Sequence, residues 1–173
     1  MTYSPVIPPI PADGRILYFG RDREDFDYLS NFYPVRVSHW YSMVQQYWPS
    51  VEHYYQWHKS DDLDYCVNIM SAPTAQEAKR LGTAVSEGRG PVFLHSEWYN
   101  ERRNVMRYGM WLKFTHPRNR DLRTLLLATE EAALVNDSPT DDYWGIGPDG
   151  QGHNWAGRLL MSVRTQLRSE SEK

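Results

Sequence analysis

The stretch SVEHYYQWHKS, residues 50–60, mixes aromatic rings with side chains that can transfer protons or attack carbon. On a helix over this stretch, Glu52, Gln56 and Lys59 stand at i, i+4 and i+7, so all three project from one stripe. A carboxylate can transfer a proton, an amide can hydrogen-bond a ligand, and an amine can act as a nucleophile. Lysine attacks only as the free amine, so this chemistry requires an environment that lowers its pKa.

Aromatic neighbours of the stripe can supply that environment. Trp48 and Tyr55 are expected to flank it and to desolvate the amine of Lys59. The pattern alone favours the plainer alternative, a solvent-facing stripe on an amphipathic helix. Both interpretations stay open at this point.

A second candidate is the segment DDYWGIGPDGQGHN, residues 141–154, which is rich in glycine. Glycines allow a ligand to approach the backbone closely, and Trp144 can stack on a base or sugar. The glycine spacing matches neither a dinucleotide-binding fingerprint nor a phosphate loop. Asp141 is either a turn residue or a second carboxylate for acid–base work, and Asn154 either caps the final helix or contacts a ligand.

Other polar residues indicate less. The six histidines lack metal-ligand spacing, so we expect no metal. The single cysteine, Cys66, excludes an internal disulfide and is expected to be a buried thiol. Most of the arginines at 102, 103, 107 and 164 are expected to be solvated or salt-bridged, although one near a pocket can hold a phosphate.

Composition limits the class of protein. The chain has 173 residues, 40% of them hydrophobic, with seven Trp, twelve Tyr and a net charge of −3. These values are typical of one globular domain that has no overall attraction for nucleic acid or anionic membrane. The N-terminus lacks the pattern of a signal peptide, and no stretch reaches the roughly 20 apolar residues of a membrane helix. We therefore expect a cytoplasmic protein.

The periodicity predicts an α+β fold, a single compact domain that is mainly helical with a few short strands. An extended arm over 1–14 precedes this domain, which covers 15–170. Strands are predicted over 15–20, 35–40 and 133–136, and helices after Ser50 and over 61–72, 74–88, 96–117, 119–129 and 155–170. Spacing alone favours a core position for Trp98.

Several motifs in their order resemble the NADAR family of YbiA-like proteins. They are LSNFY, WPSVEHYYQWHK, EWYNERRNVM, WLKF, LVNDSPTDDYWGIG and GQGHNWAGRLLMSVR, and they extend from about Phe19 to Arg164. The resemblance implies an N-glycosidase that cleaves N-ribosides without a cofactor. Two substrate classes are implied: ADP-ribose linked to guanine in nucleic acid, and early riboflavin-pathway ribosylamino-pyrimidinone phosphates.

The resemblance also implies roles for individual residues. Lys59 is implied as the nucleophile that forms a Schiff base with the opened ribose, with Glu52 and Asp141 assisting proton transfer. The implied substrate-binding residues are Asn31, Gln56, Trp98, Trp144 and Asn154.

One position departs from the family pattern. Asn136 stands where relatives often carry glutamate, which can alter substrate or rate. A non-catalytic module that binds ADP-ribose or a nucleotide is therefore the alternative function.

Overall fold

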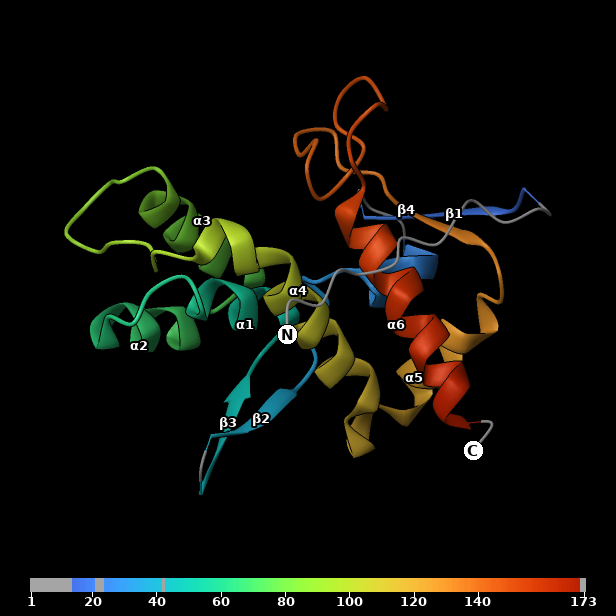
Figure 1. Cartoon of the computed structure of the whole chain (residues 1–173), viewed down its shortest axis with the longest axis horizontal. Helices are drawn as coiled ribbons and strands as arrows, with labels where there is room; N and C mark the ends of the chain where they lie inside the picture. The colour runs from blue at the N-terminus through green and yellow to red at the C-terminus, as the bar shows by residue number, and fades with distance from the viewer. Residues whose placement is uncertain (1–13, 21–23, 42, 172–173) are drawn as a thin grey trace. The chain divides into compact units, whose positions relative to one another are not determined.

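The computed structural model describes residues 14–20, 24–41 and 43–171. The arm predicted over 1–14 lies outside these residues, apart from Gly14. The chain divides into two compact units: unit 1 is Met1–Ser30 with Arg120–Lys173, and unit 2 is Asn31–Asn119. In Figure 1 unit 2 is the part of the chain coloured from cyan to yellow.

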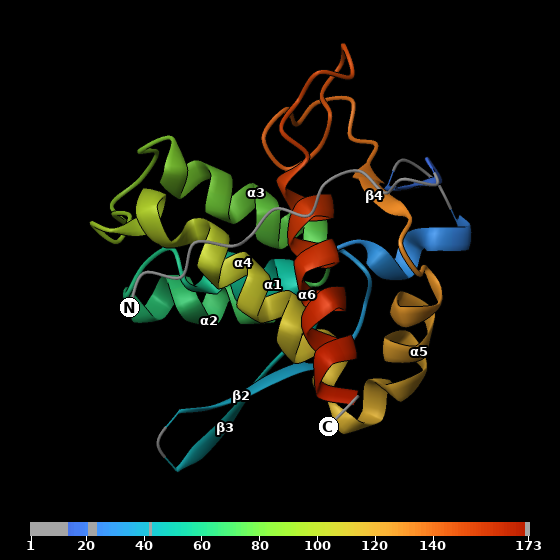
Figure 2. The same ribbon diagram turned by 45° about the vertical axis from the view of Figure 1, so that its right-hand side comes forward.

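Unit 1 is built on two parallel strands and two helices. Strand β1 (Ile16–Phe19) pairs with β4 (Ala133–Asn136), and Figures 1 and 2 show the helix α6 (Trp155–Ser171) close to β4. The approach is close because Gly157 of α6 has no side chain: a Cβ there would lie 1.9 Å from the carbonyl oxygen of Leu134. Helix α5 (Arg120–Ala128) packs against α6.

Unit 2 combines one antiparallel hairpin with four helices. The hairpin consists of β2 (Val37–Tyr41) and β3 (Val44–Trp48). The helices are α1 (Val51–Trp57), α2 (Leu63–Ser71), α3 (Ala75–Ser86) and α4 (Trp98–Thr115). The short helix α1 contacts each of the other three, so its side chains are almost all buried.

Local signals in the sequence explain where these helices begin and end. The Thr74 hydroxyl accepts a hydrogen bond from the Glu77 N–H (3.1 Å) at the start of α3, as expected of an N-cap. Gly88 follows the end of α3 with a φ of +66°, a conformation that glycine adopts without strain. Helix α4 ends before Pro117, because proline disfavours helical backbone in the residue that precedes it.

The predicted fold class, α+β with mostly helices and a few short strands, is confirmed. The predicted strands and helices are all present, with shifts of a few residues at their ends. Three elements were not predicted: strand β3 and the 3-10 segments Glu24–Leu29 and Pro117–Asn119. No helix among the described residues is long and apolar enough to cross a membrane.

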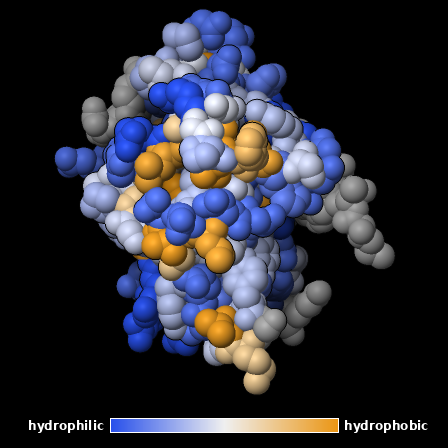
Figure 3. Space-filling model, turned by 90° about the vertical axis from the view of Figure 1, so that its left-hand side faces the viewer, coloured by the Kyte–Doolittle hydropathy of each residue, from blue (hydrophilic) through white to orange (hydrophobic). Residues whose placement is uncertain are grey.

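The β2–β3 hairpin carries exposed apolar and aromatic side chains toward its turn. Met43 is 90% exposed and Val44 65% exposed. Figure 3 shows apolar residues near the bottom of the molecule, where Figure 1 places the end of the hairpin. At its base, by contrast, Trp48 is fully buried.

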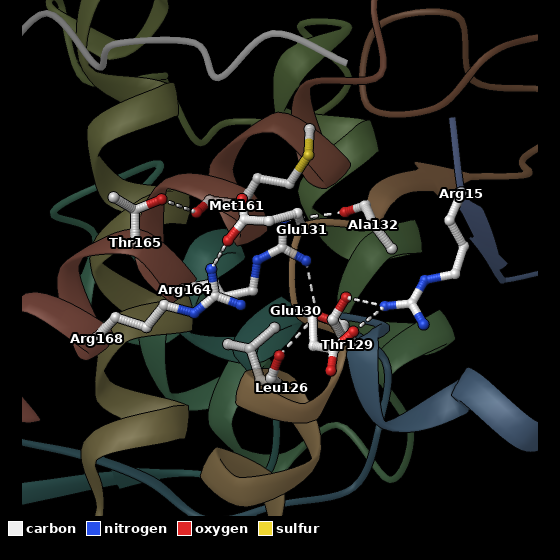
Figure 4. A network of polar contacts seen from close by, with 10 residues as sticks. All are labelled: Arg15, Leu126, Thr129, Glu130, Glu131, Ala132, Met161, Arg164, Thr165 and Arg168. Atoms are coloured by element: carbon white, nitrogen blue, oxygen red, sulfur yellow. Dashed lines mark hydrogen bonds and ion pairs between the residues drawn. The ribbon is translucent and has the colours of Figure 1, made fainter. Parts of the chain in front are cut away.

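A buried arginine holds unit 1 together at the turn between α5 and β4. The Arg164 guanidinium donates to the Thr129 hydroxyl (2.7 Å) and to the Ala132 carbonyl oxygen (2.9 Å), as Figure 4 shows. Arg164 is 3% exposed, so it is an exception to the expectation that most of these arginines are solvated or salt-bridged. Burial, together with the nearby charge of Arg168, lowers the pKa of Arg164 to about 10.

Replacing this arginine is expected to destabilise the protein. Arg164→Met keeps much of the apolar volume but leaves the Thr129 hydroxyl and the Ala132 carbonyl without this donor. We expect a loss of about 2–3 kcal/mol in the free energy of unfolding, measured by urea denaturation. Arg168→Met is the control, because its ion pair with Glu131 is open to solvent on the glutamate side and is worth less than about 1 kcal/mol. Equal free energies of unfolding in the two variants would contradict the stabilising role given to the hydrogen bonds of Arg164.

Candidate active site

The helix α1 begins with a side-chain cap that fixes Glu52 in the first turn. The Ser50 hydroxyl oxygen accepts a hydrogen bond from the His53 N–H at 3.2 Å, as predicted. The N–H of Glu52 donates to the Asn31 carbonyl oxygen at 3.0 Å. This bond places Asn31 beside the N-terminus of α1, next to a predicted site residue.

Glu52 and Gln56 form a buried hydrogen-bonded pair. The Gln56 side-chain amide donates to a carboxylate oxygen of Glu52 at 2.6 Å. Gln56 lies against Gly82 of α3, where a Cβ would come within 1.8 Å of the Gln56 Oε1. That Oε1 atom is buried and has no hydrogen-bond partner among the described residues. It is therefore a buried acceptor that faces helix α3 at Gly82.

Lys59 lies just beyond α1, in the turn that follows Trp57, so the predicted continuous helix through residue 59 was wrong. The Lys59 N–H still donates to the Gln56 carbonyl oxygen (3.1 Å). The side chain turns toward α3, where Nζ donates to the Gly82 carbonyl oxygen (2.9 Å) and the Ser86 hydroxyl (2.6 Å). The three residues of the predicted stripe thus share one neighbourhood around Gly82.

Two rings enclose the Lys59 amine. Nζ lies 5.7 Å from the centroid of the Tyr55 ring and 5.8 Å from that of Trp98, and the two rings are 4.9 Å apart. Lys59 itself is only 6% exposed. Burial lowers the pKa of Lys59 from 10.5 to about 8, against the opposing effect of the Glu52 charge.

Trp48, which was predicted to flank the stripe, contributes to a different cluster. Its ring packs against those of Tyr54, Trp57 and His58. These side chains lie on another face of α1 from Glu52 and Gln56. Trp48 therefore packs on the side of the helix that faces away from the lysine site. Of the two predicted flanking rings, only Tyr55 lies near the lysine.

In unit 1, Asp141 organises a tight turn. One carboxylate oxygen accepts hydrogen bonds from the N–H groups of Tyr143 (3.2 Å) and Trp144 (2.8 Å). This geometry agrees with the turn interpretation of Asp141. It holds Trp144 half-buried, with its ring in edge contact with Tyr143 at 5.0 Å.

Asn154 precedes α6 in a left-handed conformation, with φ of +51°. Its side chain accepts from the Asn136 N–H (2.9 Å) and donates to the Leu134 carbonyl oxygen (2.9 Å). The Asn154 side chain thus fastens the start of α6 to β4. Asn136 in turn donates from its side-chain amide to the Trp144 carbonyl oxygen (3.3 Å).

The predicted site residues therefore fall into two groups. Unit 2 brings Glu52, Gln56, Lys59 and Trp98 together, with Asn31 at the start of α1. Unit 1 brings Asp141, Trp144 and Asn154 together around the glycine-rich loop. Each group is defined within its own unit.

Sequence reasoning missed two members of the lysine site, Gly82 and Ser86. A glycine inside a helical pattern is a signal of close packing, and Gly82 fits that rule. Ser86 left no such signal, because its contact with Lys59 spans 27 positions.

The fold is a helix-rich α+β fold, and its site combines a desolvated lysine with a carboxylate. This combination is typical of enzymes that form a covalent bond to the substrate through lysine. Residues 17–168 match the NADAR domain, and the chain belongs to that family.

The relatives include proteins that the chain covers almost fully and longer ones that it covers only in part. The chain is 35% identical over 157 residues to the N-glycosidase YbiA of Escherichia coli, covering 90% of each chain. The NMR structure of Escherichia coli YbiA superposes with a TM-score of 0.77 at 33% identity, covering 92% of this chain and 88% of that one.

Two riboflavin biosynthesis proteins are also similar. The one from Vibrio vulnificus is 36% identical over 155 residues, and the chloroplastic PYRR protein of Zea mays 33% over 183 residues. These regions cover 90% and 95% of this chain. The chain spans only 39% and 29% of the lengths of those two proteins.

The close packing at Gly82 leads to a prediction about stability. Gly82→Ala is expected to lower the free energy of unfolding by about 1–3 kcal/mol, because the new methyl group displaces Gln56. In a Gln56→Ala background the same change is expected to be neutral or stabilising, since alanine is the better helix former. A double-mutant cycle by urea denaturation measures the difference. An equal effect of Gly82→Ala in both backgrounds would show that Gln56 is not the obstacle.

Proposed function

We propose that this protein is an N-glycosidase that hydrolyses an N-riboside through an imine on Lys59. The observation that carries the proposal is the buried amine, held between two rings with a pKa lowered to about 8. A lysine with its ordinary pKa is almost wholly protonated near neutral pH, whereas this one has a usable fraction of free amine. The names of relatives, among them N-glycosidase YbiA, support the same activity.

In the proposed reaction, the Lys59 amine attacks the anomeric carbon of the ribose. The carbon–nitrogen bond to the base breaks, and the base leaves with a proton. Loss of the amine proton and opening of the ring give an imine between Nζ and the sugar. Water then adds to the imine carbon, which releases the sugar and restores the amine.

The contacts of Lys59 suit this nucleophilic role. The Ser86 hydroxyl donates to the Gly82 carbonyl oxygen (3.0 Å), so its oxygen is left to accept from Nζ. A neutral amine has two N–H bonds, and these two acceptors take both of them. The lone pair is then directed away from α3, which keeps it available for attack.

Glu52 is the proposed acid–base partner. Its charge acts on Lys59, and its carboxylate is fixed by the 2.6 Å bond from Gln56. We propose that Glu52 moves a proton to the leaving base or the sugar oxygen. A role in proton transfer for Asp141 of unit 1 is a separate proposal.

The remaining predicted residues are proposed to bind substrate. Gln56 offers a buried acceptor, Trp98 and Trp144 offer ring faces, and Asn31 and Asn154 offer amides. The proposed substrates share an N-ribosidic bond: ADP-ribose on guanine in nucleic acid, and ribosylamino-pyrimidinone phosphates of the riboflavin pathway. Two relatives are named as riboflavin biosynthesis proteins, which supports the second class. The cytoplasmic location expected from the sequence stays a prediction.

The activity is expected to depend on pH through Lys59. The rate should rise with pH around a midpoint near 8, since only the free amine attacks. Glu52 raises the pKa of Lys59, so Glu52→Gln should move the midpoint to lower pH. It should also reduce the plateau rate by about 10²- to 10⁴-fold through loss of proton transfer.

The control for this profile is Glu101→Gln, which removes an exposed carboxylate and changes net charge equally. It should leave the midpoint within about 0.2 of the wild-type value, since exposed charges are screened. A midpoint that rises in Glu52→Gln would show that the Glu52 charge does not raise the pKa of Lys59.

Chemical trapping tests the imine directly. The protein is incubated with borohydride and either a guanine-ADP-ribosylated oligonucleotide or a ribosylamino-pyrimidinone phosphate, and the adduct is mapped by mass spectrometry. We expect a sugar adduct on Lys59 with one substrate, and loss of about 10³-fold or more in turnover in Lys59→Ala. Lys79→Ala, which removes another lysine of unit 2, should retain the adduct.

The outcomes separate the functions. Full turnover in a folded Lys59→Ala protein would rule out the covalent route. Tight binding of ADP-ribose without release of base from either substrate would instead identify the non-catalytic binding module.

A further inference from the structure

A hollow in unit 2 is lined by basic and aromatic side chains. It lies between the β2–β3 hairpin and the C-terminal end of α4, and its volume is about 460 Å³. The residues that matter here are Arg36, Trp40, Tyr47, His116 and Arg118. We call this the hairpin groove.

The hairpin groove is separate from the lysine site. Its α4 contributions are Leu112 and Thr115, whereas the lysine site uses Trp98 at the other end of the same helix. Fourteen residues of helix from Trp98 to Leu112 correspond to about 21 Å. The groove is therefore a candidate site in its own right.

The arginines of the groove are not neutralised by acidic side chains. Neither Arg36 nor Arg118 makes an ion pair with a carboxylate among the described residues. The Arg36 guanidinium lies 3.9 Å from the centroid of the Tyr47 ring, which fixes its plane and leaves its edge donors available. Two positive charges thus face one hollow.

His116 adds a neutral donor to the same wall. Its Nδ1 accepts a hydrogen bond from the backbone N–H of Arg118 at 3.1 Å, so in the neutral ring Nε2 carries the proton. Burial and the charges of Arg118 and Arg36 lower the pKa of His116. The ring therefore stays neutral at pH 7 and donates through Nε2.

Trp40 supplies a stacking surface. It is 59% exposed on strand β2, which is unusual for a residue that normally buries most of its area. Exposed indole beside arginines is the combination by which proteins hold single-stranded nucleic acid: bases stack on the ring and phosphates meet the guanidinium groups.

We propose that the hairpin groove binds a single-stranded nucleic acid, with a base on Trp40 and phosphates at Arg36 and Arg118. A strand suits the groove better than a lone nucleotide, because its repeated phosphates give each arginine a partner. The net charge of the chain is −3, so the attraction comes from this local cluster. The proposal goes beyond the N-glycosidase activity and does not depend on it.

The test is fluorescence anisotropy with a labelled, unmodified 15-nucleotide oligothymidylate, which carries no ADP-ribose and no base linked to ribose, so it is neither of the proposed substrates. We expect Arg36→Ala/Arg118→Ala to weaken binding by at least tenfold. Loss of two phosphate contacts should also reduce the slope of log K against log salt by about 1.4. Trp40→Ala should weaken binding by about 5- to 100-fold, and Trp40→Phe by less.

The matched control is Arg80→Ala/Arg89→Ala, which makes the same change in net charge at two exposed arginines that are paired with Glu77 and Glu87. It should weaken binding less than twofold. Equal losses in the two double variants, no binding by the wild type, or equally tight binding of thymidine monophosphate would each overturn the proposal. So would binding to phosphatidylserine vesicles but not to the oligonucleotide. Circular dichroism confirms that each variant is folded.

Discussion

The close packing of α1 on α3 at Gly82 is the constraint on which the lysine site depends. Because this position has no side chain, Gln56 can lie against α3, and the Gly82 carbonyl oxygen is reached by the Lys59 amine. A side chain at this position would displace Gln56 from its place against α3. The hydrogen bond from Gln56 to Glu52 extends the same packing to the carboxylate.

That packing buries an amine, and burial has an energetic cost. A pKa of about 8 in place of 10.5 corresponds to roughly 3 kcal/mol of destabilisation of the ammonium form. The folded protein carries this cost fully below pH 8 and loses it as the pH rises toward 10.5, because the unfolded state then binds more protons. Such a cost is typical of sites that keep a reactive group in its working protonation state.

In unit 1, glycines also allow close packing, here between α6 and β4 and within the loop that precedes α6. Gly157 brings α6 against β4, and the left-handed Asn154 joins the two through both polar ends of its amide. Glycines of the preceding loop also pack within the loop: a Cβ on Gly152 would lie 2.6 Å from the carbonyl oxygen of Gly145. The loop is thus a shaped support for Asp141 and Trp144.

The sequence by itself determined the fold class, most helices and the residue types of the site, because helical periodicity and capping residues act over a few positions. It also set Glu52 and Gln56 on one face, four residues apart. Only the tertiary structure decided that Lys59 leaves the helix and that Trp48 packs elsewhere. The acceptors of Lys59 lie 23 and 27 positions away, and contacts at that separation arise from helix packing, which no local pattern encodes.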